Sequence, residues 1–544
     1  MQPTFRLIIA AVSVGMLASC GGGSGGASGP PPTPPTVEVL PPVDISPVAA
    51  NDPGSSLPAD WMNGAFMEIY VRGYQDSDGD GIGDLKGLIQ RLDYLKDLGV
   101  TGLWLMPVTQ SQDHDHGYAV SDYRNIETQY GSLADLDELL RQAHARGLGV
   151  ILDYVMNHSA AQHPAFVNSR AAVTNSFRNW YVWQSNKPTG WNIYGGDPWR
   201  SASTGFYFAP FWDQMPDFNL TNAATVAWHH DNLRFWLNRG VDGFRFDAVG
   251  NLVENGPATW ENQPQNYALM GDVRRMMDGY ARRFLVCEAP ADPAGFGQPS
   301  ACGSAFAFGH QLDIIKAAKG DAAALRAVAD YPPTVPATMA TMVSNHDSFA
   351  GERLWDQVGG NLAQYRLAAA TYLLQPGVPF IYYGEEIGLA GAAGLSGDPR
   401  MRTPMSWTAD SARAGFTTGT PFRALSANVA TQNVATQQAD ASSLLAFYKS
   451  MLALRANRAS LRRGSYEGAT VSAGTLVFRR VHDVEQTVVA INYGSSPATV
   501  AVGGLSAGQS YPRLWPRDGT ALPADGAGNA SPLLPAHAVA IWGR

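Results

Sequence analysis

From Asp60 onward, short apolar runs alternate with amphipathic segments, and this alternation constrains the fold more than any other feature of the chain. The amphipathic segments carry apolar residues three and four positions apart, as in residues 133–147, which end at Gly147. Strand–helix alternation repeated about eight times predicts a parallel sheet in an α/β fold and, most economically, a closed (β/α)8 TIM barrel. An open doubly wound sheet is the alternative, but no G-x-G-x-x-G motif follows the first strand. The expected strands are residues 65–71, 101–108, 150–155, 243–249, 284–289, 341–347 and 378–384, with a weaker one at 304–308.

Two segments interrupt this rhythm. Residues 158–225, after the third strand, are rich in Trp, Tyr, Asn and Gly and are too long for a loop, which predicts an inserted subdomain. Residues 463–544 instead show alternating strands separated by turns, which predicts a C-terminal antiparallel β-sandwich domain. The barrel is therefore expected in two parts, residues 59–157 and 226–462.

The first 58 residues predict an export signal followed by a tether. Residues 1–19 combine Arg6, an apolar run and a small-residue stop, which is typical of a signal peptide. Residues 17–20 read LASC and resemble a bacterial lipoprotein box, which implies that Cys20 is lipidated; an ordinary signal peptide that happens to contain a cysteine is the alternative. Residues 20–58, rich in Gly, Ser and Pro, predict a flexible tether. We therefore expect an exported lipoprotein of the bacterial cell envelope, in the outer membrane or facing the periplasm, or an extracellular protein.

Charge and cysteine content narrow the class of partner. The formal net charge of -9 disfavours nucleic-acid binding. No apolar run of about 18 residues follows the first 20, so membrane contact is expected only through a lipid anchor. We also expect a monomer. With Cys20 lipidated, only Cys287 and Cys302 could pair, but Cys287 lies in an apolar run that favours a buried free thiol.

Polar residues gather at the C-terminal ends of the expected strands, which is the face of a barrel that carries active sites. An acid inside a buried strand costs several kcal/mol unless it is paired or in use. One such acid is compatible with a structural ion pair, but three on separate strands favour an active site. The polar residues at the strand ends are Asp153, Asn157, His158, Arg245, Asp247, Glu288, Asn345, His346 and Asp347.

The pattern of acids fits the cleavage of a glycosidic bond, which needs one ionised and one protonated carboxyl group. Arg245 faces the same side of its strand as Asp247, two positions later, and is expected to keep Asp247 ionised. Glu288 follows Cys287 and precedes Ala289, and these apolar neighbours are expected to raise its pKa toward that of a general acid.

Four segments, DYVMNH, GFRFDAV, VCEA and VSNHD, resemble in order and spacing the four signature regions of the α-amylase family, glycoside hydrolase family 13. The resemblance covers roughly residues 60–544 and implies a retaining mechanism, with the two principal carboxyl groups about 5 Å apart. It implies that Asp247 is the nucleophile, Glu288 the general acid/base and Asp347 the transition-state stabiliser. It also implies a set of residues that hold the sugar: Arg245, His158 and His346, with Tyr118 stacked beneath it.

The segment DSDGDGIGD resembles the first half of a calcium loop. Asp76, Asp78 and Asp80 alternate, and Gly81 permits a tight turn, but Gly87 stands where an EF-hand has its closing Glu. Asp84 and the carbonyl of Ile82 are expected to complete the shell around Ca²⁺. The same loop in oligo-1,6-glucosidase-like members binds calcium, and an acidic surface turn without a metal is the alternative.

Other segments place the chain between two subgroups. MPDFN, at residues 215–219, is intermediate between the motifs of oligo-1,6-glucosidases and neopullulanases. Asp115 and Arg402 match residues that close the far wall of the pocket in oligosaccharide-acting members, which suggests exo action; a loop acid and a surface Arg are the alternative. After Asp247 the family's typical Lys-His pair is missing, which puts the central calcium site and the usual grip on the leaving sugar in doubt.

We therefore expect hydrolysis of α-1,4-glucosidic bonds in starch-like glucans or malto-oligosaccharides. The alternatives are an exo-acting α-glucosidase or oligo-1,6-glucosidase and a transglycosylase similar to a trehalose synthase. A non-catalytic starch-binding surface lipoprotein is less favoured, because such proteins normally lose the catalytic carboxylates that this chain retains at Asp247, Glu288 and Asp347.

Overall fold

The computed structural model of the protein describes residues 42–544. The expected signal peptide, Cys20 and the tether up to residue 41 lie outside this range. Within it, no helix has both the length and the apolar character needed to cross a membrane.

Parallel strands form the central sheet in the order β10-β9-β5-β2-β1-β12-β11. Phe66 on β1 pairs with Gly102 on one side and with Phe380 on the other. The strands are β1 (Phe66–Ile69), β2 (Gly102–Leu105), β5 (Gly149–Tyr154), β9 (Gly243–Phe246), β10 (Phe284–Cys287), β11 (Ala340–Thr341) and β12 (Val378–Tyr382).

The gap between β10 and β11 is closed by two isolated bridges, Cys287 to Ala305 and Phe306 to Ala340. The N–H of Phe306 donates to the carbonyl of Cys287 at 3.1 Å, and the N–H of Ala340 donates to that of Ala305 at 2.9 Å. Residues 304–308 thus take the position of the eighth strand of the barrel, as their weak strand pattern predicted. The closed (β/α)8 barrel is confirmed.

Aromatic rings fill one end of the barrel. Phe66 stacks on Phe284 and on Phe380, with ring centroids 4.8 Å apart in each pair. Gly102 leaves room for this layer, because a Cβ there would lie 2.3 Å from the ring of Phe66. Gly149 does the same for Trp61. Because apolar rings fill this end of the barrel, the polar side chains lie at the other end, where the strands have their C-termini.

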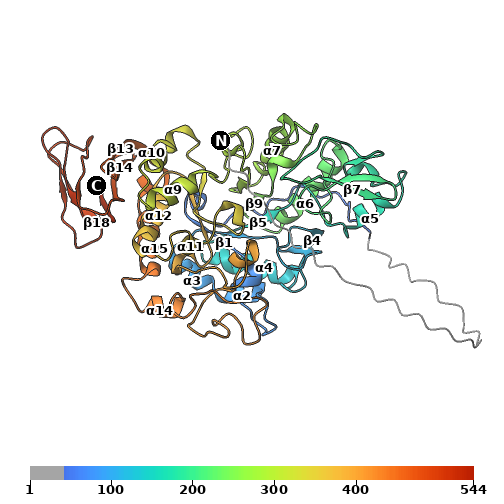
Figure 1. The fold of residues 1–544 in the computed structure, drawn as a ribbon, viewed down its shortest axis with the longest axis horizontal. Helices are drawn as coiled ribbons and strands as arrows, with labels where there is room; N and C mark the ends of the chain where they lie inside the picture. Colours follow the sequence, from blue (N-terminus) through green and yellow to red (C-terminus); the bar gives the residue numbers. More distant parts are fainter. Residues whose placement is uncertain (1–41) are drawn as a thin grey trace, which may run out of the picture. The chain divides into compact units, whose positions relative to one another are not determined.

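Helices surround the sheet (Figure 1). α4 begins with a capping box in which Ser132 and Asp135 bond each other's backbone N–H groups. The longer helices are α3 (Leu92–Leu98), α4 (Leu133–Ala145), α6 (Ala223–Asn238), α7 (Pro264–Met277), α9 (His310–Ala318), α10 (Ala322–Asp330), α12 (Leu362–Leu374) and α15 (Leu444–Asn457). Shorter ones are α1 (Val71–Tyr74), α2 (Leu85–Gln90), η3 (Val249–Asn251), α13 (Asp398–Met401), α14 (Val434–Gln438) and α16 (Ala459–Arg463).

The predicted subdomain lies between β5 and α6 and is drawn in teal to green around α5 and β7 in Figure 1. It contains α5 (Pro164–Ala171) and a three-stranded antiparallel sheet in the order β6-β8-β7. Its strands are β6 (Trp183–Gln184), β7 (Trp199–Ala202) and β8 (Gly205–Phe208). A hairpin that the sequence did not predict, β3 (Thr109–Ser111) and β4 (Val120–Ile126), precedes α4.

The C-terminal domain is an antiparallel sheet in the order β13-β14-β15-β21-β18, backed by the short ladders β16–β20 and β17–β19. Val488, Tyr511 and Trp542 belong to the core shared by the sheet and the ladders. The strands are β13 (Ser465–Ser472), β14 (Thr475–His482), β15 (Glu485–Asn492), β16 (Ala498–Thr499), β17 (Ser510–Tyr511), β18 (Arg513–Trp515), β19 (Leu522–Pro523), β20 (Leu533–Leu534) and β21 (Ala538–Gly543).

The tether prediction is wrong for residues 43–58, which lie against the barrel. Asp44 forms an ion pair with Arg124 at 2.8 Å, and the N–H of Val48 donates to Asp231 at 3.0 Å. Leu57 is buried. The Gly, Ser and Pro content of this segment indicated a tether. Its partners are remote in the sequence, so no local pattern reveals these contacts.

The expected free thiol at Cys287 is also wrong, because Cys287 and Cys302 form a disulfide. Their Cα atoms lie 6.2 Å apart. The parallel bridge between Cys287 and Ala305 returns the chain alongside β10 and brings Cys302 within reach. An apolar strand pattern predicts burial, but it says nothing about a partner that a loop brings back.

Candidate active site

Arg245, on β9, organises the carboxyl ends of the neighbouring strands. Its Nη1 donates to Asp153 and to Asp247, each at 2.8 Å, and its Nη2 donates to Glu288 at 2.7 Å. The Arg245 side chain is 1% exposed. One buried cation therefore holds three carboxyl groups from three strands, a surplus of negative charge that favours keeping a proton in the cluster.

The raised pKa of Glu288 favours the proton on this side chain. Burial raises it to about 7, with Arg245 opposing the shift and the charges of Asp247 and Asp347 adding to it. Burial also raises the pKa of Asp247, against the attraction of Arg245. At neutral pH, Glu288 is thus poised to give up or take a proton next to a carboxylate.

The backbone after Asp247 ties the two acids together. Ala248 has a φ of 45°, in the left-handed region that residues with a Cβ seldom adopt. In this conformation its N–H donates to Oε2 of Glu288 at 3.0 Å. The strained turn therefore fixes Glu288 relative to Asp247.

Asp347 lies in a second charged cluster, around His346. Nδ1 of His346 lies 2.6 Å from Glu68, and Nε2 lies 3.1 Å from Asp347. Burial alone would lower the pKa of His346, but Asp347 and Glu68 raise it to about 10. Burial alone would raise the pKa of Asp347, but His346, Arg402 and Arg245 bring it below its usual value. Asp347 is therefore ionised beside an imidazolium.

Tyr118 and His158 border the same cavity. The ring of Tyr118 stacks on His346, with centroids 5.5 Å apart, and its hydroxyl donates to Asp153 at 2.9 Å. Burial lowers the pKa of His158 to about 3, so its ring is neutral. Nδ1 of His158 accepts from the amide of Asn157 at 3.3 Å, which leaves the proton on Nε2. That Nε2 is buried and has no hydrogen-bond partner among residues 42–544.

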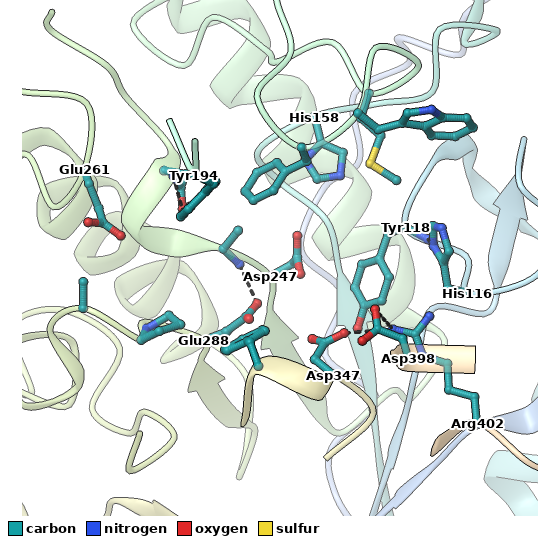
Figure 2. Close-up of a pocket in the computed structure, with 18 residues that line it drawn as sticks. His116, Tyr118, His158, Tyr194, Asp247, Glu261, Glu288, Asp347, Asp398 and Arg402 are labelled. Atoms are coloured by element: carbon teal, nitrogen blue, oxygen red, sulfur yellow. Dashed lines mark hydrogen bonds and ion pairs between the residues drawn. The ribbon is translucent and has the colours of Figure 1, made fainter. Parts of the chain in front are cut away.

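These groups surround a cavity of about 780 Å³. In Figure 2, Asp247 and Glu288 lie at its centre, with Tyr118 and Arg402 on one side and Tyr194 and Glu261 on the other. Sequence reasoning did not single out several of its lining residues, among them His116, Tyr194, Phe211, Trp212, Asn251, Glu261, Phe349 and Asp398.

The expected wall formed by Asp115 and Arg402 is different in the structure. Arg402 lines the cavity and binds Asp347 at 2.8 Å and Asp398 at 3.2 Å. Asp115 is not among the lining residues, and its carboxylate is held by Arg423 at 2.7 Å and by the hydroxyl of Tyr70. Besides Asp347, the acid that pairs with Arg402 is therefore Asp398, at the start of α13, and not Asp115.

The sequence carried a signal for one missed residue and not for the others. Glu68 is an acid inside the buried strand β1, the same anomaly that singled out Asp247 and Glu288. Asp398 begins the four-residue helix α13 and Arg423 lies in an irregular segment, and a charged residue is ordinary at either place. Only the folded chain shows that they face the cavity or its supporting residues.

The predicted calcium loop brings three of its acids together. Carboxylate oxygens of Asp76, Asp78 and Asp84 lie within 4.8 Å of one another. Asp80 is outside this group, and its Oδ1 accepts from the N–H of Ile82 at 2.7 Å. Burial raises the pKa of Asp80, and the charges of the neighbouring acids add to this. The oxygen donors and the repulsion between them fit a hard divalent cation.

Known proteins resemble this chain over most of its length. The chain matches the catalytic domain of alpha amylase over residues 68–464. It is 33% identical over 416 residues to alpha-amylase 3 of Dictyoglomus thermophilum, an alignment that covers 75% of this chain and 80% of that protein. It is 34% identical over 475 residues to the trehalose synthase/amylase TreS of Mycolicibacterium smegmatis, covering 76% and 79%.

Among solved structures, the alpha-glucosyl transfer enzyme XgtA is similar, with a TM-score of 0.77 and 30% identity. The match covers 89% of this chain and 99% of that one. Together with the family match over most of the barrel, these relatives establish that the chain is an enzyme and belongs to the α-amylase family of glycoside hydrolases.

Proposed function

We propose that the protein is a retaining hydrolase of α-1,4-glucosidic bonds in starch-like glucans or malto-oligosaccharides. The observation that carries the proposal is the pair Asp247 and Glu288, held on one guanidinium at the centre of the cavity. Glu288, with a pKa of about 7, supplies the proton, and Asp247 supplies the carboxylate.

The proposed reaction has two steps. Asp247 attacks the anomeric carbon as the bond to the glycosidic oxygen breaks, and Glu288 gives its proton to that oxygen. Water then attacks the anomeric carbon, the ester to Asp247 breaks, and the proton of the water passes to Glu288. Asp347, which stays ionised, stabilises the positive charge that develops on the sugar.

Other side chains hold the sugar in this scheme. The N–H of His158 is placed to donate to a sugar oxygen, whereas both N–H groups of His346 are committed to Glu68 and Asp347, so that His346 acts through Asp347 and Tyr118. Tyr118 presents its ring to one face of the sugar. Arg245 orients the two acids and does not itself hold the sugar, because both of its Nη atoms are committed to carboxylates.

We propose that the loop 76–84 binds Ca²⁺ through Asp76, Asp78 and Asp84. The ion would hold the turn after α1 by neutralising its acids. Asp76 already organises this turn, accepting from the N–H groups of Asp78 at 2.9 Å and Gly79 at 2.7 Å and from the hydroxyl of Thr417.

Product analysis on maltoheptaose tests the reaction. Internal cuts with an α-configured new reducing end, observed by proton NMR at the first time points, support the proposal. A β-configured product contradicts the retaining assignment, and absence of any turnover contradicts the activity.

A second candidate is an exo-acting α-glucosidase or a transglycosylase. The ion pair of Arg402 with Asp398 lines one side of the cavity and favours a pocket that is blocked there. The similarity to TreS and XgtA is compatible with transfer. Release of glucose alone from maltoheptaose supports the exo enzyme, and a new linkage supports transfer.

We also propose that the protein is exported and anchored through Cys20. The buried disulfide between Cys287 and Cys302 is typical of oxidising compartments. Expression with labelled palmitate tests the anchor: label in the native chain and none in Cys20→Ser supports it, and equal labelling contradicts it.

A further inference from the structure

A polar group outside the catalytic cluster lines the cavity on the side away from Arg402. Figure 2 shows Tyr194 and Glu261 on one side of Asp247 and Glu288, and Asp398 and Arg402 on the other. Neither Tyr194 nor Glu261 has a role in the chemistry described above.

Glu261 is an uncommitted carboxylate. It is partly buried, it lines the cavity, and burial raises its pKa. Within residues 42–544 its side chain has no ion pair and no hydrogen bond, in contrast to Asp247, Glu288 and Asp347. An acid placed in a cavity without a protein partner has its acceptor oxygens free for a ligand.

The backbone holds Glu261 at a fixed place relative to the nucleophile. The next residue, Asn262, has a left-handed φ of 54°, and its N–H donates to the carbonyl of Gly250 at 2.8 Å. The amide of Asn266 donates to the same carbonyl at 2.6 Å. Because Gly250 belongs to η3, directly after Asp247 and Ala248, the loop that carries Glu261 is bound to the segment that carries the nucleophile.

Tyr194 brings an aromatic face to the same place. It belongs to the inserted subdomain and is 62% exposed. The amide of Asn251 donates to its hydroxyl at 3.2 Å, and the ring of Trp260 meets its ring edge-on at 5.3 Å. The ring also stacks on Phe211, at 5.9 Å. The subdomain is thus bound to η3 next to the reacting centre, with a tyrosine ring left open.

An open aromatic ring, an amide and a free carboxylate are the groups that recognise a sugar. The ring packs on the apolar face of a pyranose, and the carboxylate accepts hydrogen bonds from its hydroxyl groups. We propose that Glu261, with Tyr194 and Asn251, binds the sugar on the leaving-group side of the bond that is cleaved, and that after this sugar departs the same site binds a hydroxylated acceptor. Glu261 then determines specificity for the leaving and acceptor sugars. This inference rests on the proposed function.

Transfer to an acceptor sugar follows the second step of the proposed reaction, with a sugar hydroxyl in place of water. A hydroxyl oxygen of the acceptor sugar forms the bond to the anomeric carbon as the ester to Asp247 breaks, and its proton passes to Glu288. The site therefore sets how much of the glycosyl-enzyme goes to a sugar and how much goes to water.

Two substrates separate this site from the catalytic centre. Maltose has a sugar as its leaving group, whereas α-glucosyl fluoride loses only fluoride and leaves the proposed site without a sugar. For Glu261→Gln we expect the ratio of kcat/KM on maltose to kcat/KM on α-glucosyl fluoride to fall by about tenfold to a hundredfold. We also expect the yield of transfer product from α-glucosyl fluoride with added glucose to fall in parallel.

A ratio within twofold of the native value overturns the proposal, and so does an equal loss on both substrates, which indicates a structural role. Failure of the native enzyme to hydrolyse α-glucosyl fluoride contradicts the proposed function instead. Glu138→Gln, an exposed acid on α4 paired with Arg141, is the matched control and should keep the native ratio.

If Glu261→Gln does not fold, Tyr194→Ala carries the same comparison, because the exposed ring contributes little to the core. Loss of the stacking ring should lower the ratio by about tenfold. A native ratio in Tyr194→Ala then overturns the proposal.

Discussion

Nη2 of Arg245 lies 2.7 Å from Oε2 of Glu288, while Nη1 of the same guanidinium lies 2.8 Å from Asp247. The two acids are therefore held by one rigid, planar cation. Their relative position does not depend on a flexible side chain, and the charge that each feels depends on the protonation of the other.

The activity should fall as the pH rises through the pKa of Glu288. Glu288 must be protonated to release a sugar, and its pKa is about 7. Above that pH, kcat/KM on maltose is expected to drop by about tenfold per pH unit. A pH profile of initial rates measures this.

The control for the pH profile is α-glucosyl fluoride, whose leaving group needs less help from an acid and should show a weaker alkaline limb. Asp347, with its lowered pKa, stays ionised throughout and adds no second limb in this range. A profile on maltose that stays flat up to pH 9 contradicts the assignment of Glu288 as the acid.

Asp247→Asn should remove turnover and keep the fold. The amide retains the shape of the side chain but cannot form the glycosyl ester, so kcat is expected to fall by more than about a thousandfold. Initial rates on maltoheptaose, with circular dichroism as the check of folding, measure this. A variant that keeps a tenth of the activity contradicts the nucleophile assignment.

Calcium removal should lower the thermal stability. A bound ion stabilises the folded state by about 2.7 kcal/mol at a concentration one hundred times its Kd. A chelator is therefore expected to lower Tm by several degrees, and added Ca²⁺ should restore it. Asp78→Asn supplies the control, because it removes one of the three clustered carboxylates and should make Tm insensitive to the chelator. Native protein whose Tm ignores the chelator speaks against the site.

The disulfide should contribute measurably to stability. It closes a loop with a sequence separation of 15, for which the chain-entropy estimate is about 3 kcal/mol. Urea unfolding of Cys302→Ser should show a free energy of unfolding lower by about that amount. Thiol titration in denaturant provides the check: with Cys20 replaced by Ser, the unreduced chain should contain no reactive thiol, and two reactive thiols would contradict the bond.

The barrel was predictable because its signal repeats along the chain. Most buried parallel strands, such as 102–105 or 284–287, are apolar runs that local sequence shows. The catalytic acids stand out for the same reason: Asp247 and Glu288 directly follow such runs, where a charge is costly. Glu68 carried the same signal inside β1 and was overlooked.

The remaining parts depended on contacts between distant residues. Composition indicated a tether at 43–58, but Asp44 pairs with the distant residue Arg124. An apolar run indicated a free thiol at Cys287, but the loop that returns beside β10 brings Cys302 to it.

The sequence by itself determined the fold class and the acids at the strand ends, because burial and periodicity are local properties. Only the tertiary structure decided which charges meet, such as Arg402 with Asp398 and Asp115 with Arg423, and which have no partner in the described part of the chain, such as Glu261. The physical reason is that the energy of a charge depends on its neighbours in space, and irregular loops bring those neighbours together without any periodic pattern.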